Sequence, residues 1–580
     1  MRWVVPETDA EIASRLSHEL SLPPLIARLL ALRGIRDAAS ASRFLRPTLE
    51  HLHDPSLMQD MDRAVARLKR AVDGKEKILI YGDYDVDGAM AAVILRTALV
   101  SMGGAVDVHI PHRLLDGYGM RAHAIEQAAR DGCRVVVSVD TGIREHAVLA
   151  RARELGLDCI VTDHHLPGET LPQAFAILNP QRSGCPYPEK GLSGVGVAFK
   201  LVQALLGFRL SERAIRSYLK LVALGTIADV APLTGENRTI AYFGLEGLTQ
   251  SARMEAASGR AGLPALLAVS GLQGKAISSA DVAFRLAPRL NAAGRMESAK
   301  DVMALFANAT AAEAQAIAAR LEALNRDRQR VETEILNEIK KQMEGRPEIA
   351  LRASLVFHGQ GWHRGVIGIV AQRVVDLYRR PALVIALDGG SAYGSGRSIP
   401  GFHLLDALAG SSHLFDRFGG HAQAAGFALP ISNVVRLADE FERYASALLA
   451  GSDPEPVLRV DARISLNELT EQVYSELQRL EPFGLGNPSP VFISSVTVAG
   501  LPRVLKEKHL KLCMQGARRS FYAVGWGLGS YAPRLANGQS AEVAFTVAEN
   551  QFQGETSLRL ILKDIHLRSS EERPEATDKG

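Results

Sequence analysis

Aspartate and histidine residues cluster directly after short apolar runs of this chain, within residues 77–88, 135–142, 159–165 and 221–230. The first three segments are rich in Val and Ile and are then broken by Gly or Asp, which is typical of buried parallel strands. In an open α/β sheet, ligands bind at the carboxyl ends of the strands. We therefore expect the following residues to gather at that edge: Asp83, Asp85, Asp87, Asp140, Asp163, His164 and His165.

So many carboxylates in one half-buried crevice repel each other unless a cation offsets their charge. Carboxylate and imidazole ligands without thiolate favour Mn²⁺ or Mg²⁺ over structural zinc. The number of candidate ligands suits two ions that share a bridging aspartate. Two such ions activate water and stabilise both oxygens of an in-line phosphoryl displacement. The sequence therefore predicts metal-dependent phosphoester chemistry.

Two simpler interpretations of these aspartates have to be weighed. Asp83, Asp85, Asp87 and Gly88 match the start of a calcium-binding EF-hand loop, but Ile94 stands where the loop needs Glu, and a strand precedes it rather than a helix. An aspartate before glycine is also common in turns, and for a single residue that interpretation is favoured. It weakens because every cluster follows a strand-like run.

The composition is that of a multidomain globular protein of 580 residues, with 47% hydrophobic and 23% charged residues. A net charge of +3 permits nucleic acid as a partner without requiring it. The four cysteines show no C-x-x-C spacing, so a disulfide framework or zinc-thiolate site is disfavoured and a cytoplasmic location is expected. Neither a signal peptide nor a membrane-spanning run is visible.

The element pattern changes along the chain and predicts an α/β multidomain protein. Alternating strand-like and helical segments indicate βαβ units, whereas residues 311–343 lack Gly and Pro and predict one long helix. Period-two alternation near the end predicts a small antiparallel barrel. The expected regions are a helical arm (1–48), an α/β domain (49–310), a connecting helix (311–345), a second α/β domain (346–450), a barrel (455–568) and a disordered tail (569–580).

The four segments resemble motifs I to IV of the DHH phosphoesterase superfamily, named for the triplet Asp163, His164 and His165. Its first motif usually reads H-x-x-x-D-x-D, and Tyr81 takes the place of that histidine here. The resemblance implies catalysis by Asp140, His164 and His165, with Asp140 bridging two ions and His165 contacting the phosphoryl group. The metal ligands that it implies are Asp85, Asp87, Asp140, His164 and Asp229, with Asp83 as a possible substitute for the missing histidine.

Further segments, in the same order along the chain, resemble the RecJ family within this superfamily. They include YGDYDVDGAMAAVIL, LGTIADVAPL, APRLNAAGRM, WHRGVIGIVAQRV and FGGHAQAAGF. The resemblance implies a DHH catalytic domain, a DHH-associated substrate-binding domain and an OB-fold. It also implies an exonuclease that degrades single-stranded DNA from its 5′ end to mononucleotides in repair and recombination. A single-strand-binding protein and a helicase are the protein partners that it suggests.

Arginines and other donors outside the metal ligands are candidates for holding phosphate. The resemblance implies such a role for Arg113, Arg289, Arg295, Arg397, Ser398 and His421, although each arginine alone could be an ion-paired surface residue. The glycine-rich stretch 191–200 lacks G-K-[ST], so no nucleotide cofactor is expected. Basic residues near aromatic ones in the predicted barrel suit single-strand binding, or are a solvated face: Lys506, Lys508 and Lys511.

Two other functions share parts of this pattern. A small-substrate phosphoesterase, acting on a short oligonucleotide or pyrophosphate, would use the same metal site but would not need a barrel or a chain this long. A non-catalytic DNA-binding relative would keep the architecture and lose ligands. All five implied metal ligands are intact here, which argues against the second alternative.

Overall fold

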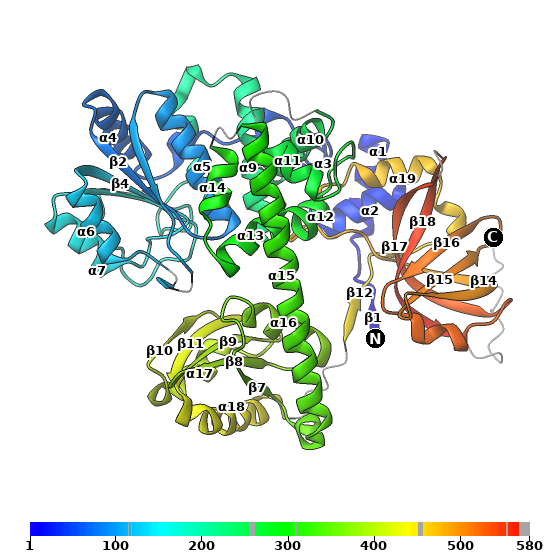
Figure 1. Cartoon of the computed structure of the whole chain (residues 1–580). Helices are drawn as coiled ribbons and strands as arrows, with labels where there is room; N and C mark the ends of the chain where they lie inside the picture. The colour runs from blue at the N-terminus through cyan, green and yellow to red at the C-terminus, as the bar shows by residue number, and fades with distance from the viewer. Residues whose placement is uncertain are drawn as a thin grey trace. The chain divides into compact units, whose positions relative to one another are not determined.

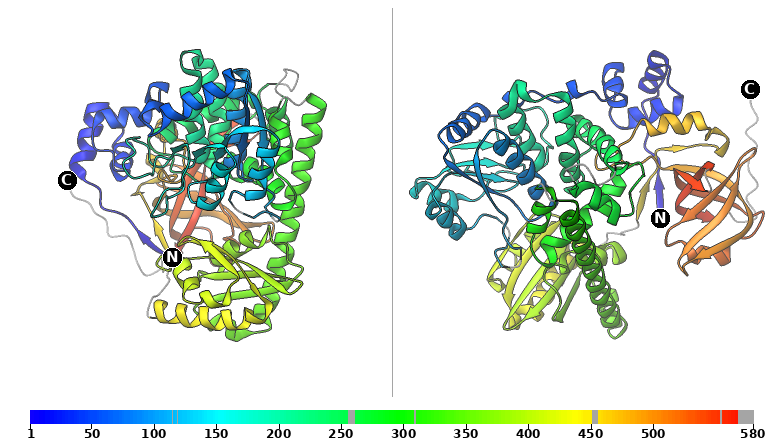
Figure 2. Two further views of the ribbon diagram at one scale, coloured as in Figure 1. Left: turned by 90° about the vertical axis from the view of Figure 1, so that its left-hand side faces the viewer. Right: turned by 45° about the horizontal axis from the view of Figure 1, so that its top comes forward.

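The computed structural model describes residues 1–113, 115–117, 119–254, 261–307, 310–450, 456–552 and 555–567 (Figures 1 and 2). The chain forms two compact units. The larger unit contains residues 53–231 and 243–454, and the smaller unit contains residues 1–52, 232–242 and the described part of 455–580. The tail expected at 569–580 lies outside the described residues.

The first sheet of the larger unit is the expected parallel sheet, with strand order β3-β2-β4-β5-β6. Its strands are rich in buried Val and Ile because helices cover both faces. Helices α6 and α7 pack on one face through the core around Leu79, Val136 and Val161, and α4, α5 and α8 contact each other on the opposite face. The strands are β2 (Lys77–Tyr81), β3 (Ala105–His109), β4 (Cys133–Val139), β5 (Asp158–Thr162) and β6 (Ala176–Leu178). The helices are α4 (Met61–Asp73), α5 (Val86–Ser101), α6 (Ala122–Arg130), α7 (His146–Glu154) and α8 (Gly194–Leu206).

A helical region follows this sheet and ends in one long helix, α15 (Ala311–Glu344), of 34 residues. Thr310 and Glu313 form a capping box that fixes where α15 begins. Its first half packs on α11 and α13, and its second half on α16, so α15 connects the two α/β regions of the larger unit (Figure 1). The helices before it are α9 (Glu212–Ala228), α10 (Gly235–Ala252), α11 (Gly262–Val269), α12 (Ser279–Asp281), the π-helix η4 (Val282–Leu286), α13 (Ala287–Met296) and α14 (Lys300–Phe306).

The second sheet has the order β10-β11-β9-β8-β7, in which only β7 and β8 are parallel. Packing within this sheet explains Gly394 and Gly396. A Cβ at Gly394 would lie 2.0 Å from the Phe427 ring, and one at Gly396 would lie 2.7 Å from Leu383. The elements are β7 (Leu355–Gln360), α16 (Ile367–Tyr378), β8 (Ala382–Asp388), β9 (Ser391–Arg397), α17 (Leu404–Ala409), β10 (Arg417–Gly420), β11 (Ala424–Pro430) and α18 (Val434–Leu449).

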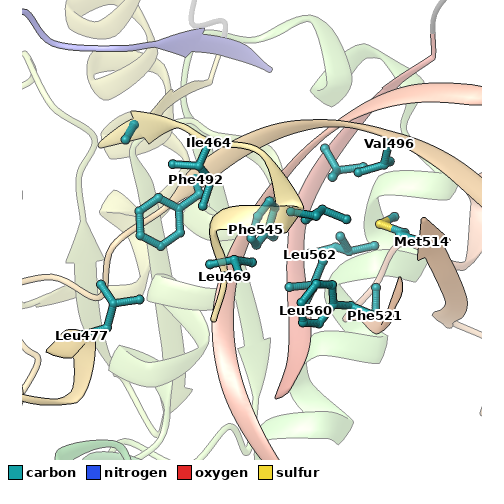
Figure 3. Close-up of a cluster of buried hydrophobic side chains, with 14 of the residues drawn as sticks. Ile464, Leu469, Leu477, Phe492, Val496, Met514, Phe521, Phe545, Leu560 and Leu562 are labelled. Atoms are coloured by element: carbon teal, nitrogen blue, oxygen red, sulfur yellow. The ribbon is translucent and has the colours of Figure 1, made fainter. Parts of the chain in front are cut away.

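A five-stranded β-barrel dominates the smaller unit, and it is closed because β17 pairs with both β18 and β14. The barrel was expected to be antiparallel, but β16 and β18 pair in parallel, so that expectation was wrong for one of its seams. Its interior is apolar, with Phe492, Phe545 and Leu560 at the centre (Figure 3). The strands are β14 (Phe492–Leu505), β15 (His509–Gln515), β16 (Ser520–Gly525), β17 (Ser540–Phe552) and β18 (Glu555–Leu567).

The N-terminal region belongs to the same core as the barrel. Leu16 and Ile26 lie in one hydrophobic cluster with the barrel residues, and Trp3 stacks on His566 with ring centroids 3.8 Å apart. The helical arm expected at residues 1–48 thus begins with a strand, which pairs in parallel with β12. The elements are β1 (Arg2–Val4), α1 (Ala10–Leu20), α2 (Pro24–Leu32), α3 (Ala38–Leu45), β12 (Val457–Arg459), β13 (Ala462–Arg463) and α19 (Glu471–Gln478). Among the described residues, no helix is long and apolar enough to cross a membrane.

One buried arginine explains why residues 232–242 join the smaller unit. The Arg238 guanidinium donates to the carbonyl of Phe44 at 2.9 Å and to the carbonyls of residues 479–482 at 2.7–3.4 Å. It also lies over the Phe44 ring, 3.7 Å from the centroid. Five carbonyl acceptors offset the cost of burying this charge, and the planar guanidinium can reach all of them at once.

We expect Arg238→Lys to destabilise the smaller unit by about 2–4 kcal/mol, because a lysine ammonium has too few donors, in the wrong geometry, for these carbonyls. Differential scanning calorimetry measures the loss as a lower melting temperature of that unit. Arg443→Lys is the matched control, since the Arg443 side chain is 76% exposed. Equal melting temperatures for the two variants would contradict the role assigned to Arg238.

Candidate metal centre

Polar residues converge at the carboxyl edge of the parallel sheet, as the sequence predicts. Asp83 and Asp85 follow β2, Asp140 follows β4, and His164 and His165 lie in the loop after β5. Two further carboxylates come from helix ends: Asp87 lies in the first turn of α5, and Asp229 caps the C-terminus of α9. The potential ligand atoms lie within 4.8 Å of one another in each of three groups: Asp140, His164 and His165; Asp87, His164 and Asp229; Asp83, Asp85 and Asp140.

His164 lies at the middle of this arrangement. Its Nε2 is 3.1 Å from Oδ1 of Asp140, 3.7 Å from Oδ2 of Asp229 and 3.9 Å from Oδ2 of Asp87. Burial and the neighbouring His165 lower the pKa of His164 to about 4, so its imidazole is neutral at pH 7. Its other ring nitrogen is left to donate to the backbone of Leu192. The Nε2 lone pair then faces a carboxylate oxygen, and neither atom has a hydrogen-bond partner within the described chain.

The buried carboxylates of the centre lie so close together that their negative charges repel one another. Burial, with repulsion from the neighbouring aspartates, raises the pKa of Asp83 to about 8, of Asp87 to about 7 and of Asp229 to about 9. The same causes raise the pKa of Asp140 well above its ordinary value. A divalent cation among these oxygens and Nε2 would offset the repulsion and satisfy the orphaned atoms. The residues present therefore fit the two-ion site expected from the sequence.

Asp87 is held by the N-terminus of helix α8. Both of its carboxylate oxygens accept backbone N–H groups at the start of α8, from Gly194 at 2.6 Å and from Val195 at 2.9 Å. A Cβ at Gly194 would lie 2.5 Å from Oδ1 of Asp140, so only glycine fits there. The glycine-rich segment that superficially resembles a nucleotide-binding loop therefore serves to hold Asp87 beside Asp140.

Asp140 itself has an unusual backbone, with φ = +61°. Left-handed φ is uncommon for residues other than glycine and costs conformational energy, which proteins tolerate mainly at functional sites. The amide of Asp140 donates to the carbonyl of Thr162 at 2.9 Å, which ties the end of β4 to the end of β5. The strained turn places the carboxylate of Asp140 in two of the three ligand groups.

Asp163 organises the centre rather than facing it. Its carboxylate bonds with His165 Nδ1 at 2.7 Å and accepts the amide of Ile143 at 3.0 Å. Burial opposes ionisation of Asp163, but these hydrogen bonds outweigh it and hold its pKa below the usual range. In return, Asp163 and the nearby Asp229 outweigh the effect of burial on His165 and raise its pKa to about 9. Tyr81, at the position of the superfamily's histidine, is fully buried, and its hydroxyl donates to the carbonyl of Gly119 at 3.3 Å.

Three arginines gather beside the carboxylates. Burial and the charges of Arg113 and Arg397 lower the pKa of Arg295 to about 9, which indicates that these guanidinium groups are close together. Arg113 also lies over the Tyr84 ring, 4.8 Å from the centroid. Its positive charge opposes the rise in the pKa of Asp83 that burial causes. None of the three forms an ion pair with another residue of the described ranges, although Arg295 donates to one backbone carbonyl, and Arg397 donates to another carbonyl and to a serine hydroxyl. Burial, together with the nearby charges of Arg397 and His165, lowers the pKa of His421.

Two other candidates for phosphate binding are held more firmly, one by an ion pair and the other by burial. Arg289 pairs with Glu322 at 2.6 Å and donates to the carbonyl of Arg285. The hydroxyl of Ser398 is buried and donates to the carbonyl of Phe402 at 2.6 Å. The remaining candidates, Lys506, Lys508 and Lys511, are exposed residues of the smaller unit, at and after the turn between β14 and β15.

Two residues that were not predicted from the sequence position the loop after β5 that carries His164 and His165, here called the histidine loop. The side-chain amide of the fully buried Asn179 donates to the carbonyl of His165 at 2.9 Å and accepts the amide of Gln181 at 2.8 Å. The side chain of Gln181 donates to the carbonyl of His164. The only signal in the sequence was a polar segment after the short strand β6, which by itself predicts an ordinary turn.

Three parts of the chain match known domain families. Residues 77–226 match the DHH family, N-terminal domain, residues 349–447 match the DHHA1 domain, and residues 460–564 match the RecJ OB domain. The first match contains the metal centre, apart from Asp229. The third covers the barrel.

Relatives and solved structures resemble nearly the whole chain. The single-stranded-DNA-specific exonuclease RecJ of Bacillus subtilis is 36% identical over 97% of this chain and 70% of its own length. The crystal structure of RecJ from Thermus thermophilus with Mn²⁺ has a TM-score of 0.83 at 31% identity, over 98% of this chain and 80% of that one. The corresponding structure with Mg²⁺ has a TM-score of 0.76 at 29% identity, over 98% and 79%.

We expect Asn179→Ala to weaken Mn²⁺ binding by about 10–100-fold, because the carbonyl of His165 and the amide of Gln181 lose their partner and the histidine loop loosens. Isothermal titration calorimetry measures this directly. Asn433→Ala is the control, since Asn433 makes the same type of bond, to the carbonyl of Leu414 at 3.0 Å, elsewhere in the larger unit. Unchanged Mn²⁺ affinity in Asn179→Ala would show that the loop holds its shape without this amide.

Proposed function

This chain belongs to the RecJ family, and we propose that it is an exonuclease specific for single-stranded DNA that hydrolyses phosphodiester bonds at the metal centre. The observation that carries the proposal is the pair of orphaned atoms, Nε2 of His164 and Oδ1 of Asp140, 3.1 Å apart. Two acceptors that face each other in a buried site are arranged to share a cation.

Mn²⁺ or Mg²⁺ would be held by Asp85, Asp87, Asp140, His164 and Asp229, with Asp83 beside them. When bound, such ions activate a water molecule and stabilise the oxygens of an in-line displacement. The protein's own part is to hold the carboxylates at fixed separation through the backbone of α8 and the strained turn at residue 140. His165, oriented by Asp163, is placed to donate a hydrogen bond to a phosphoryl oxygen.

Substrate binding near the centre is assigned to Arg113, Arg295 and Arg397, with His421 beside them. Guanidinium groups without ion-pair partners are well suited to phosphate, which they can bind through two parallel hydrogen bonds. Burial and the charge of Arg113 lower the pKa of both Arg295 and Arg397, so a bound phosphate relieves repulsion within the cluster. This arrangement would hold a terminal phosphate while the next phosphodiester lies at the ions.

The barrel supplies a second surface for the strand. On β15 and β16, Lys511 Nζ lies 5.5 Å from the centroid of the Tyr522 ring. The side chains of Tyr522 and Trp526 are 66% and 59% exposed, which is high for aromatic residues. Exposed aromatic and basic side chains together suit base stacking and phosphate contact along one strand. A small-substrate phosphoesterase would have no use for this surface.

Several finer statements are part of the proposal. The direction of digestion, from the 5′ end to mononucleotides, is expected from family membership, as is a role in repair and recombination. A single-strand-binding protein and a helicase are proposed as partners because duplex must be opened first. The four cysteines are free thiols, which fits the proposed location in the cytoplasm.

The test of this function uses a long single strand labelled at either end in turn. With Mn²⁺, we expect immediate release of mononucleotide from the 5′ label, and resistance of blunt duplex. Chelation of the metal should abolish cleavage. Asp140→Asn should lower the rate by about a thousandfold, because it removes the proposed bridging charge, while asparagine still tolerates φ = +61°.

The control is Asp107→Asn, which changes a carboxylate of the same sheet that is 54% exposed and pairs with Lys77. It should cleave at the wild-type rate. Activity of the wild type that survives chelation, or near-normal cleavage by Asp140→Asn, would overturn the metal assignment. Early release from the 3′ label would overturn the direction alone.

We expect the replacement of Lys506, Lys508 and Lys511 by Gln to raise the dissociation constant for a long single strand about tenfold at low salt. The slope of the logarithm of the dissociation constant against the logarithm of the salt concentration should fall by about two, because fewer counterions are released. Dinucleotide cleavage should change little. Filter binding at several salt concentrations provides the measurement, and the control is the same change at Lys69, Lys340 and Lys341, which are exposed on the larger unit. Equal losses for both triple variants would mean that the barrel lysines are only a solvated face.

A further inference from the structure

Val230 has a backbone conformation that its side chain disfavours. Its φ is +58°, which is a rare outlier for a β-branched residue. The side chain is 62% exposed, so burial in the core does not repay the strain. A strained residue with an exposed apolar side chain calls for a reason outside the packing of the fold.

The backbone conformation at this position is one that glycine usually adopts. The amide of Val230 donates to the carbonyl of Ile227 at 3.2 Å, and the amide of Ala231 donates to the carbonyl of Thr226 at 3.1 Å. These two bonds form a Schellman motif that ends α9, and its left-handed residue is usually glycine. Glycine would make the same backbone bonds without strain, so the isopropyl group serves something other than the turn.

The position of Val230 suggests what its side chain contacts. It directly follows Asp229, whose Oδ2 is 3.7 Å from Nε2 of His164. On a different element, Leu166 directly follows His165, and its side chain is 63% exposed. The carbonyl of Leu166 accepts a hydrogen bond from Arg144 Nε at 2.9 Å, which fixes this part of the loop. Two branched apolar side chains therefore stand next to residues of the metal centre.

We propose that Val230 is a substrate contact, and that its side chain packs against the face of the base of the nucleotide whose phosphodiester lies at the metal centre. The inference rests on the proposed function and adds the residue that positions the nucleoside. Every base has an apolar face, so such a contact positions the strand without reading its sequence. It also requires a base that is not stacked within a duplex, which favours single strands.

The first test is Val230→Gly, assayed with Mn²⁺ present. The variant should keep its melting temperature within about 2 °C, because relief of strain offsets the extra freedom of glycine in the unfolded chain. Its kcat/KM on single-stranded DNA should fall about five- to tenfold, mainly through KM. The matched control is Arg379→Gly, which also replaces an exposed left-handed residue at a helix end, with φ = +56°. This control should keep full activity.

The second test replaces the terminal nucleotides of the strand by abasic ones. Wild type should digest this strand about five- to tenfold less efficiently than normal DNA, and Val230→Gly should show a smaller difference between the two substrates. Equal sensitivity of both proteins to the missing bases, or an unchanged kcat/KM in Val230→Gly, would overturn the contact. A failure of the proposed function is distinct, because wild type would then not digest normal single strands.

Discussion

Repulsion among buried carboxylates is the constraint around which the larger unit is built. Asp83, Asp87, Asp140 and Asp229 are all held where burial and their neighbours disfavour their charged forms. Such a cluster cannot arise by relaxation of loops, because the free chain would separate the charges. It exists because strand ends, the amides of α8 and the C-terminus of α9 each fix one carboxylate independently. Binding free energy of the cations then stabilises the folded state.

The strands and the carboxylates that follow them were predictable because the pattern is local. Runs of Val and Ile ending in Asp identify β2, β4 and β5, and parallel strands place their ends at one edge. The supports of the site were not predictable, since they come from distant residues. The bonds from Gly194 and Val195 to Asp87 span more than a hundred positions, and no spacing rule links them. Asn179 is only 14 positions from His165, but it was missed because a polar residue after a short strand by itself predicts an ordinary turn.

The internal partners of two phosphate-binding candidates, and the one wrong expectation in the barrel, have an equally physical cause. Motif matching selects donors by type, but a guanidinium neutralised by an ion pair, or a buried hydroxyl that already donates its one proton, is poorly suited to bind phosphate. Ser398 and Arg289 each have an internal partner, which only the packed structure reveals. In the barrel, alternation gives the face of each strand but not the direction of its neighbour. The parallel pairing of β16 with β18 is set by the connection between them.

The discontinuous make-up of the smaller unit has a consequence for how the protein is made. Residues 1–52 are synthesised well before their core partners in the barrel, which follow only after about four hundred residues. Until then α1, α2 and α3 have apolar faces with nothing to cover them, and chaperones bind surfaces of that kind. The larger unit can complete its own core during this interval, because all of it lies within residues 53–454. Of that range, only the segment 232–242 belongs to the smaller unit. Arg238 is thus synthesised after Phe44 but well before residues 479–482, so its guanidinium can reach four of its five carbonyl acceptors only once that later segment has been made.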